Sequence, residues 1–266
     1  MRSKYHRRTG QGCATIVSSE LSVVVMPAVA LSSDSQGEEC WPPLESNPQV
    51  FNQVISQLAN NNRLECYDIV SFDPADLAYL PPAVIAVLLL FPVTEKYEKS
   101  CSEAQDISLA EQRELPKDLF YMKQTVKNAC GMVALLHALG NNPSFLGHSC
   151  LVADFVRSTK DKTPEQRGIA MASSPELAAI QSFAAKLGQS QAIDARENVL
   201  HHFVCFVSGS DAKLYELDGR KTSPLCCGST KDGNFLAAAL EQCRQFPQRC
   251  GEHVNYNAIA ICALQE

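Results

Sequence analysis

The sequence has 266 residues, of which 45% are hydrophobic and 20% are charged, and its net charge is −6. This composition is typical of a globular protein and excludes a largely disordered chain, and the length suits one or two domains. The mild negative charge argues against a nucleic-acid-binding protein and permits a basic protein partner. The longest apolar run, residues 83–93, is too short to span a bilayer, so no membrane association is expected.

Residues 1–40 differ in composition from the rest of the chain. All charged residues before Glu20, the first acidic residue, are basic. A short apolar run at 21–31 is interrupted by Pro27. Such a segment resembles an organelle transit peptide or, less closely, a signal peptide, and a disordered extension is the simpler reading. We therefore divide the chain into a disordered or targeting extension, residues 1–40, and one folded domain, residues 41–266.

The first half of the folded domain shows both helical and strand patterns. Asn47 and Pro48 are typical of a helix N-cap and first turn, and apolar residues then recur at helical spacing up to Leu58. Residues 83–91 are apolar at both strand parities, which predicts a central strand covered on both faces. The other expected elements are a strand at 64–72, a turn or helix start at 73–76 and an exposed connection at 95–118.

In the second half, an almost wholly apolar, buried helix is expected from Cys130 to Gly140. Helices that interleave with strands on a sheet covered on both faces predict a three-layer α/β (α+β) architecture. The remaining expected elements are a short helix at 151–157, a weakly patterned crossing segment at 168–198, strands at 200–207 and 214–217 around a turn, a helix from Leu236 that ends at Pro247, and a last strand at 257–264.

The twelve cysteines form no recognisable disulfide or metal pattern. The adjacent Cys226 and Cys227 are unsuited to bridging each other, because disulfide geometry resists it. Cys243, Cys250 and His253 lack the fourth ligand and the paired spacing of a zinc site, so no metal is expected. Free thiols indicate a reducing compartment, and a cytoplasmic location is expected, with the nucleus or an organelle left open by the N-terminal extension.

One of these cysteines, Cys130, lies at an expected helix start, where unpaired backbone N–H groups and the helix dipole favour a thiolate. Gly131 is expected to leave room for a substrate backbone beside the sulfur. The side-chain amide of Gln124 could donate a hydrogen bond to an oxyanion. The alternative is a cysteine that only packs at a helix end.

A catalytic thiolate needs a base, and the sequence contains six histidines. If the turn between the strands at 200–207 and 214–217 centres on Ser210, His202 faces Asp218 across the hairpin and His201 points to the other side. A nucleophile oriented by an imidazole, itself oriented by a carboxylate, is the arrangement of a catalytic triad. An ordinary strand His–Asp pair is the alternative.

Several segments of the sequence together resemble the ubiquitin carboxyl-terminal hydrolase family, and in particular its short, single-domain branch of cysteine peptidases. The resemblance covers the chain from Trp41 to about Leu264. The segments that carry it are WPPLESNPQVFNQVISQL, AVIAVLLLFPVTEKYE, FYMKQTVKNACGMVALLHAL, TPEQR, HHFVCFV and LYELDGRKTSP.

The resemblance implies a role for each candidate residue. Cys130 would be the nucleophile and His202 the general base and later the acid. Asp218 would orient the histidine, and Gln124 would be the oxyanion donor. The residues matched to the family's ubiquitin-binding segments are Pro43, Leu44, Glu45, Asn47 and Pro48, together with Val254, Asn255, Tyr256 and Asn257.

The family fold is a papain-like three-layer sandwich with a mostly antiparallel sheet and a knotted backbone. Residues 178–197 correspond to its crossover loop, which limits substrates to ubiquitin carrying small or unfolded adducts. No metal or organic cofactor is implied, and a monomer is expected. Two alternatives stay open: a hydrolase for a ubiquitin-like modifier, and a ubiquitin-binding module whose thiol senses oxidants.

Overall fold

An antiparallel sheet of six strands runs through the part of the chain that the computed structural model describes, residues 40–60, 62–99, 101, 115–147, 149–188, 199–251 and 255–264. Every neighbouring pair of strands is antiparallel, as the resemblance predicts. In the order in which they pair, the strands are β1 (Leu64–Asp68), β6 (Asn257–Ala263), β2 (Ala83–Pro92), β3 (His201–Ser208), β4 (Lys213–Leu217) and β5 (Leu225–Ser229).

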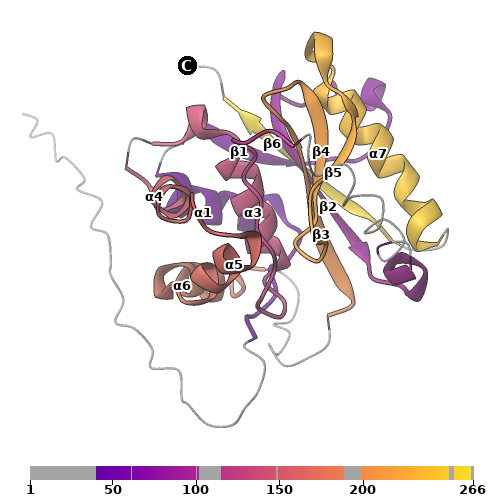
Figure 1. Cartoon of the computed structure of the whole chain (residues 1–266). Coiled ribbons are helices and arrows are strands. Elements are labelled where there is room, and N and C mark those ends of the chain that lie inside the picture. Colours follow the sequence, from indigo (N-terminus) through magenta and orange to yellow (C-terminus); the bar gives the residue numbers. More distant parts are fainter. Residues whose placement is uncertain are drawn as a thin grey trace, which may run out of the picture. The chain divides into compact units, whose positions relative to one another are not determined.

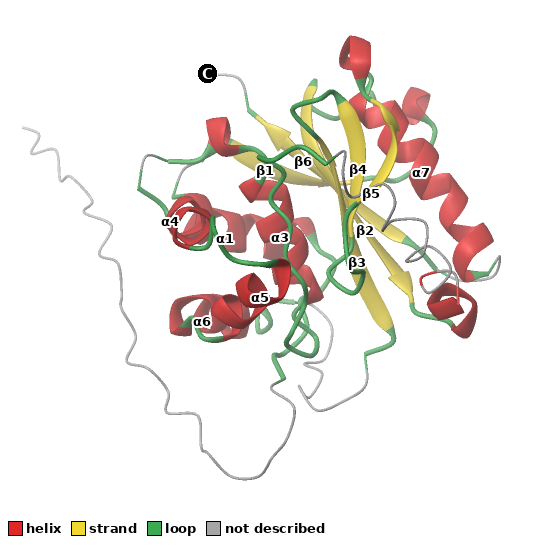
Figure 2. Cartoon of the chain, viewed as in Figure 1, coloured by secondary structure: helices red, strands yellow, loops and turns green. Residues whose placement is uncertain are grey.

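Helices cover both faces of this sheet, so the three-layer prediction is confirmed (Figures 1 and 2). On one side lies α7 (Phe235–Cys250), which packs on β2 and β3. The layer on the other side contains α1 (Pro48–Ala59), α3 (Cys130–Gly140), α4 (Leu151–Ser158), α5 (Pro164–Ala172) and α6 (Pro175–Ala184). The knotted topology that the resemblance implies stays a prediction.

Strand β2 lies in the middle of the sheet because its residues are apolar on both faces, at odd and at even positions alike. Leu88 enters the apolar cluster under α1 and α3, and its neighbours Val87 and Leu89 enter the cluster under α7. All three are fully buried, which removes apolar surface from water on both faces of the strand. The helix α3 is likewise buried along its whole length, as its apolar sequence predicts.

The crossing segment expected at 168–198 is wrong over its first half, because helices α5 and α6 run through it. Thr163 caps α5 with a capping box, and the hydroxyl of Ser174 accepts from the backbone N–H of Leu177 at the start of α6. Leu177 and Ile180 then bury one side of α6, a stripe that the surrounding alanine and serine obscure in the sequence. Residues 189–198 lie outside the described residues.

Four smaller corrections concern element boundaries. Strand β1 ends at Asp68, short of residue 72, and β5 was not predicted at all. Helix α7 passes through Pro247 and ends at Cys250, and the φ of 120° at the next residue, Gly251, lies outside the helical region. The connection at 95–118 is not exposed at its start, because residues 95–99 are helical and Tyr97 is fully buried.

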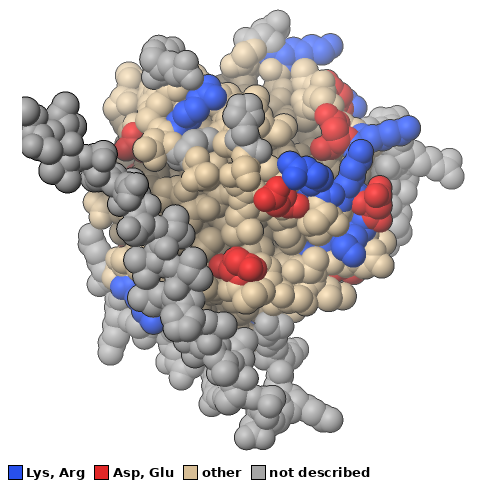
Figure 3. Space-filling model, turned by 90° about the vertical axis from the view of Figure 1, so that its left-hand side faces the viewer, with Lys and Arg blue, Asp and Glu red and all other residues tan. Residues whose placement is uncertain are grey.

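Charged side chains are mixed in sign on the face of the molecule turned toward the viewer in Figure 3. Acidic and basic groups lie side by side there, and a broad area between them carries no described charge. No described helix is both long enough and apolar enough to cross a membrane.

Candidate active site

The thiol of Cys130 lies in the first turn of α3, which begins without a side-chain cap. Burial by itself would raise the pKa of this thiol. A hydrogen bond and the charge of His202, with backbone hydrogen bonds from Phe203 and Gly131, outweigh the burial and lower the pKa below its ordinary value. His202 is thus the main group that favours the thiolate, and the backbone N–H of Gly131 at the helix start makes a smaller contribution.

Gly131, the residue after the candidate nucleophile, packs closely against the side chain of Leu44. A Cβ atom at this position would lie 3.1 Å from the Cβ and Cδ1 atoms of Leu44. A larger residue at this position would therefore push against Leu44, and the expectation that Gly131 leaves room for a substrate backbone stays a prediction.

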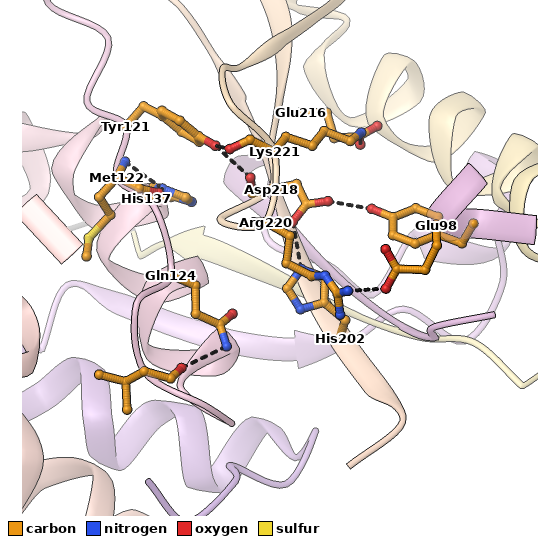
Figure 4. A network of polar contacts seen from close by, with 12 residues as sticks. Glu98, Tyr121, Met122, Gln124, His137, His202, Glu216, Asp218, Arg220 and Lys221 are labelled. Carbon is orange, nitrogen blue, oxygen red and sulfur yellow. Dashed lines mark hydrogen bonds and ion pairs between the residues drawn. The ribbon is translucent and has the colours of Figure 1, made fainter. Parts of the chain in front are cut away.

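His202 and Asp218 form a buried pair beside the thiol (Figure 4). The Nε2 atom of the imidazole lies 2.7 Å from Oδ1 of the carboxylate. Because Nε2 faces the carboxylate, Nδ1 is the ring nitrogen left for a partner on the other side of the ring. His201, the neighbouring histidine, points to the opposite face of β3 and is exposed, because it is the first residue of the strand.

The predicted register of the hairpin formed by β3 and β4 is wrong, but His202 and Asp218 are nevertheless close together. Phe206 faces Glu216, which places the centre of the turn one residue later than Ser210. The turn includes Ala212 at a φ of 55°, a conformation that alanine rarely adopts and that the sequence does not announce. When the centre of the turn moves by one residue, each residue of β3 faces a residue two positions further along the chain. A shift of two keeps side chains on the same face of the sheet, so His202 and Asp218 remain on one face as diagonal neighbours.

The charges of the pair stabilise each other. Burial acts against the charged imidazole, but the charge and hydrogen bond of Asp218 raise the pKa of His202 to about 9. Burial also acts against the charged carboxylate, and His202 nevertheless holds the pKa of Asp218 well below its usual range, with help from Lys221 and Tyr97. An imidazolium and a carboxylate are therefore the favoured forms near neutral pH, and the charged imidazole in turn favours the thiolate of Cys130.

Gln124 lies on the segment that leads into α3 and packs against the turn after Asp218. Its backbone N–H donates to the carbonyl oxygen of Gly219 over 2.8 Å. Its side-chain Nε2 donates to the carbonyl oxygen of Val126 over 2.9 Å, while its Oε1 is buried without a partner. One N–H of the amide is thus committed to fixing the side chain, and the second is available as a donor.

Helix α5 holds this segment in place from the outside. The backbone N–H of Lys123 donates to the carbonyl oxygen of Pro164, and a Cβ at Gly168 would lie 2.3 Å from the carbonyl oxygen of Lys123. Arg167 donates to the carbonyl oxygen of Tyr121 over 2.8 Å. These contacts fix the backbone on both sides of Met122 and hence the approach to Gln124.

Comparisons with known proteins identify the family. The sequence matches the family model of ubiquitin carboxyl-terminal hydrolase, family 1, over residues 41–248. It is 36% identical over 226 residues to a ubiquitin carboxyl-terminal hydrolase of Drosophila melanogaster, a match that covers 85% of this chain and 99% of the relative. The chain belongs to the ubiquitin carboxyl-terminal hydrolase family. It is therefore an enzyme of the cysteine type.

Other relatives show the same extent of similarity. Ubiquitin carboxyl-terminal hydrolase 3 of Arabidopsis thaliana is 35% identical over 88% of this chain, and human isozyme L1 is 31% identical over 83%. The catalytic domain of Trichinella spiralis UCH37, solved with ubiquitin vinyl methyl ester, superposes with a TM-score of 0.67 at 23% identity, covering 86% of this chain and 97% of that one. The structural likeness supports the fold of the hydrolase family.

The two segments matched to the family's ubiquitin-binding regions meet in this hydrolase. The hydroxyl of Ser46 lies 2.6 Å from Oδ1 of Asn257, which joins the chain before α1 to the start of β6. Leu44 is buried under Gly131, so it supports this surface from below and is not part of it. Pro43, Glu45, Asn47, Pro48 and Tyr256 are partly exposed, Asn255 and Asn257 are exposed, and Val254 lies outside the described residues.

The structure also reveals residues near the hydrolase site that the sequence did not single out. The hydroxyl of Tyr97 donates to Oδ2 of Asp218, and the hydroxyl of Tyr121 lies 2.7 Å from the carbonyl oxygen of Asp218. Lys221 and Arg249 neutralise the buried Glu216 over 2.5 Å and 2.7 Å. Tyr97, Tyr121 and Lys221 lie in segments that resemble the family, and Arg249 lies in α7. Their spacing in the sequence gives no sign that they lie near Cys130 and His202.

No group of side chains able to hold a metal ion is found among the described residues. Cys243 and Cys250 are both buried in α7, and His253 lies outside the described residues.

Proposed function

We propose that this hydrolase cleaves amide and ester bonds at the C-terminal glycine of ubiquitin, with Cys130 as nucleophile. The observation that carries the proposal is the buried pair of His202 and Asp218, 2.7 Å apart, together with the lowered pKa of the Cys130 thiol that His202 causes. Membership of the family and its relatives of known name support ubiquitin as the modifier.

In the acylation step, the thiolate of Cys130 attacks the carbonyl carbon of the glycine and forms a tetrahedral adduct. The free N–H of Gln124 and backbone N–H groups at the helix start stabilise its oxyanion, an interaction that contributes about 3 kcal/mol per donor in comparable sites. His202 gives its proton to the leaving amine or alcohol, the bond to the leaving group breaks, and a thioester remains.

In the deacylation step, neutral His202 takes a proton from water, and the resulting hydroxide equivalent attacks the thioester. The second tetrahedral adduct collapses with loss of the Cys130 thiolate, which releases the C-terminal carboxylic acid of ubiquitin and regenerates the thiolate–imidazolium pair. The acid then gives its proton to solvent and becomes the carboxylate. Asp218 keeps its charge throughout and holds the imidazole in the orientation that both steps need.

Substrate recognition is proposed to use a protein interface. The surface that Ser46 and Asn257 join would contact the body of ubiquitin, and the C-terminal tail would then extend to Cys130. The family's crossover loop limits adducts to small or unfolded groups. The segment matched to it, residues 178–197, is not a loop at its start, because residues 178–184 belong to α6. We propose the same substrate range here, acting as a monomer.

The proposed function predicts a specific order of rates for the wild-type enzyme. A fluorogenic amide of ubiquitin should be hydrolysed faster than the same amide of a ubiquitin-like modifier, and a folded ubiquitin dimer should be cleaved slowest. The measurement is kcat/KM for the two amides beside a gel assay of the dimer. Faster turnover of the ubiquitin-like substrate would reassign the modifier, and efficient dimer cleavage would contradict the limit on adduct size.

The pH dependence of kcat/KM should follow the thiolate–imidazolium pair. The lowered pKa of Cys130 should place the acid limb of the kcat/KM profile below the ordinary pKa of a thiol. His202 must be protonated to release the leaving group, and its pKa is raised to about 9, so activity should be lost as the pH rises through about 9. Rates of the ubiquitin amide between pH 5 and 10 test this, and an alkaline limb near the ordinary histidine pKa would contradict it.

A further inference from the structure

The second oxygen of the Asp218 carboxylate is held by a residue from a distant part of the chain. Oδ1 accepts from His202 over 2.7 Å and from the backbone N–H of Arg220 over 2.9 Å. Oδ2 accepts from the hydroxyl of Tyr97, which lies 121 positions away in the sequence. The carboxylate is fully buried, so each of these donors replaces a water molecule that the site excludes.

The Tyr97 hydroxyl is held rigidly, because its ring is packed on two sides. The ring of Phe91 from β2 lies 4.6 Å from it at an interplanar angle of 62°, and the ring of Phe246 from α7 lies 6.5 Å away. Phe91 also packs edge-on against His202 at 5.8 Å. The ring of Phe91 thus contacts both Tyr97 and His202, the two side chains that donate to the Asp218 carboxylate.

The helical turn that carries Tyr97 is anchored at its start. The hydroxyl of Thr94 accepts from the backbone N–H of Tyr97 over 3.2 Å and donates to the carbonyl oxygen of Cys250 over 2.8 Å. Burial, followed by the charge of Asp218, raises the pKa of Tyr97 well above its ordinary value. The hydroxyl therefore keeps its proton and serves the carboxylate as a donor.

A second contact from the same turn is weaker. Glu98 pairs with the guanidinium of Arg220, whose backbone N–H donates to Asp218 (Figure 4). Both side chains of this ion pair are 39–49% exposed, and exposed pairs contribute little because water and salt screen them. The buried hydrogen bond of Tyr97 to a charged acceptor is the stronger of the two.

We propose that Tyr97 is a positioning residue that acts through Asp218 and keeps its carboxylate aligned with His202. The proposal rests on the function proposed above. Without the hydroxyl, Oδ2 is left buried and unpaired, and the carboxylate turns to recover a donor. His202 then loses part of the interaction that keeps it charged and oriented, and the thiolate of Cys130 becomes less populated.

The test compares two buried tyrosines whose hydroxyls each donate to a carboxylate. Tyr97→Phe removes the donor to Asp218, and the matched control Tyr215→Phe removes a 2.9 Å donor to Asp211 in the hairpin turn. Both are made in the full chain, and Tyr97→Phe is also made on an Asp218→Asn background. The readouts are kcat and KM for the ubiquitin amide, the Tm, and the rate of iodoacetamide labelling of Cys130 at pH 7, followed by peptide mass spectrometry.

Tyr97→Phe should lower kcat about ten-fold, leave KM within two-fold, and slow the labelling of Cys130 several-fold, the size expected for one hydrogen bond to a charged group. Tyr215→Phe should change neither rate, and it should lower the Tm less, because Asp211 is exposed to water. On the Asp218→Asn background, Tyr97→Phe should cause no further loss, because its effect passes through the carboxylate.

Unchanged kcat and labelling in Tyr97→Phe, or the same loss with Asp218→Asn already present, would overturn the proposal. The labelling readout needs no ubiquitin, so it also gives a result if the wild-type enzyme fails to hydrolyse the ubiquitin amide. That failure would count against the proposed function alone.

Discussion

Replacement of Cys130 by alanine should abolish hydrolysis of the ubiquitin amide while ubiquitin still binds. No other described thiol is placed to substitute for it, because only Cys130 combines a lowered pKa with a hydrogen-bonded imidazole. Burial raises the pKa of other core thiols, such as Cys205 and Cys243, and keeps them protonated. Loss of a triad nucleophile typically lowers kcat roughly a million-fold, which is below detection in this assay.

A cysteine outside the site provides the matched control. Cys226 lies half-buried in β5, so Cys226→Ala removes a thiol without touching the site. Turnover of the ubiquitin amide and the Kd for ubiquitin should be measured for both variants and for the wild type. Turnover retained in Cys130→Ala, or lost equally in Cys226→Ala, would show that the reaction does not pass through Cys130.

The elements that carry the site were predictable because their signals are local. Helix α3 is apolar around its whole circumference and stops at Gly140, and strand β2 is apolar at both parities, so periodicity alone predicts both as buried. The N-cap at Asn47 is equally local, since its side chain accepts from Gln49 within the same turn.

In the hairpin of β3 and β4, the predicted centre of the turn is wrong, but the predicted pairing of His202 with Asp218 is found in the structure. The turn contains Ala212 in the left-handed region, where glycine or asparagine would have marked it, so its centre could not be read from composition. The error of one residue in the centre moves partners by two, and the parity that brings His202 and Asp218 to one face is unaffected.

The contacts that complete the site could not be predicted because they join segments far apart in the chain. Tyr97 lies in a polar stretch without periodicity, and only the fold places its hydroxyl on Asp218. The same holds for Leu44, whose side chain packs closely against Gly131. Periodicity reports which face of an element is buried, and it does not report which side chain of another element covers that face.

Replacement of His202 and of His201 should separate the catalytic imidazole from its neighbour. His202→Ala removes both the base and the charge that stabilises the thiolate, so kcat should fall by roughly a thousand-fold or more. It also leaves Asp218 buried without its main partner, which lowers the free energy of unfolding. His201 is exposed and points away, so His201→Ala should stay within several-fold of the wild type.

The loss of stability in His202→Ala must be distinguished from the loss of chemistry. The Tm of each variant and its Kd for ubiquitin should therefore be measured with kcat, at a temperature well below the lower Tm. A folded His202→Ala protein that binds ubiquitin and does not turn over places the defect in proton transfer and thiolate formation. If His201→Ala were the inactive variant, the imidazole that serves Cys130 would be the one on the opposite face of β3, and the pairing with Asp218 would have no part in the reaction.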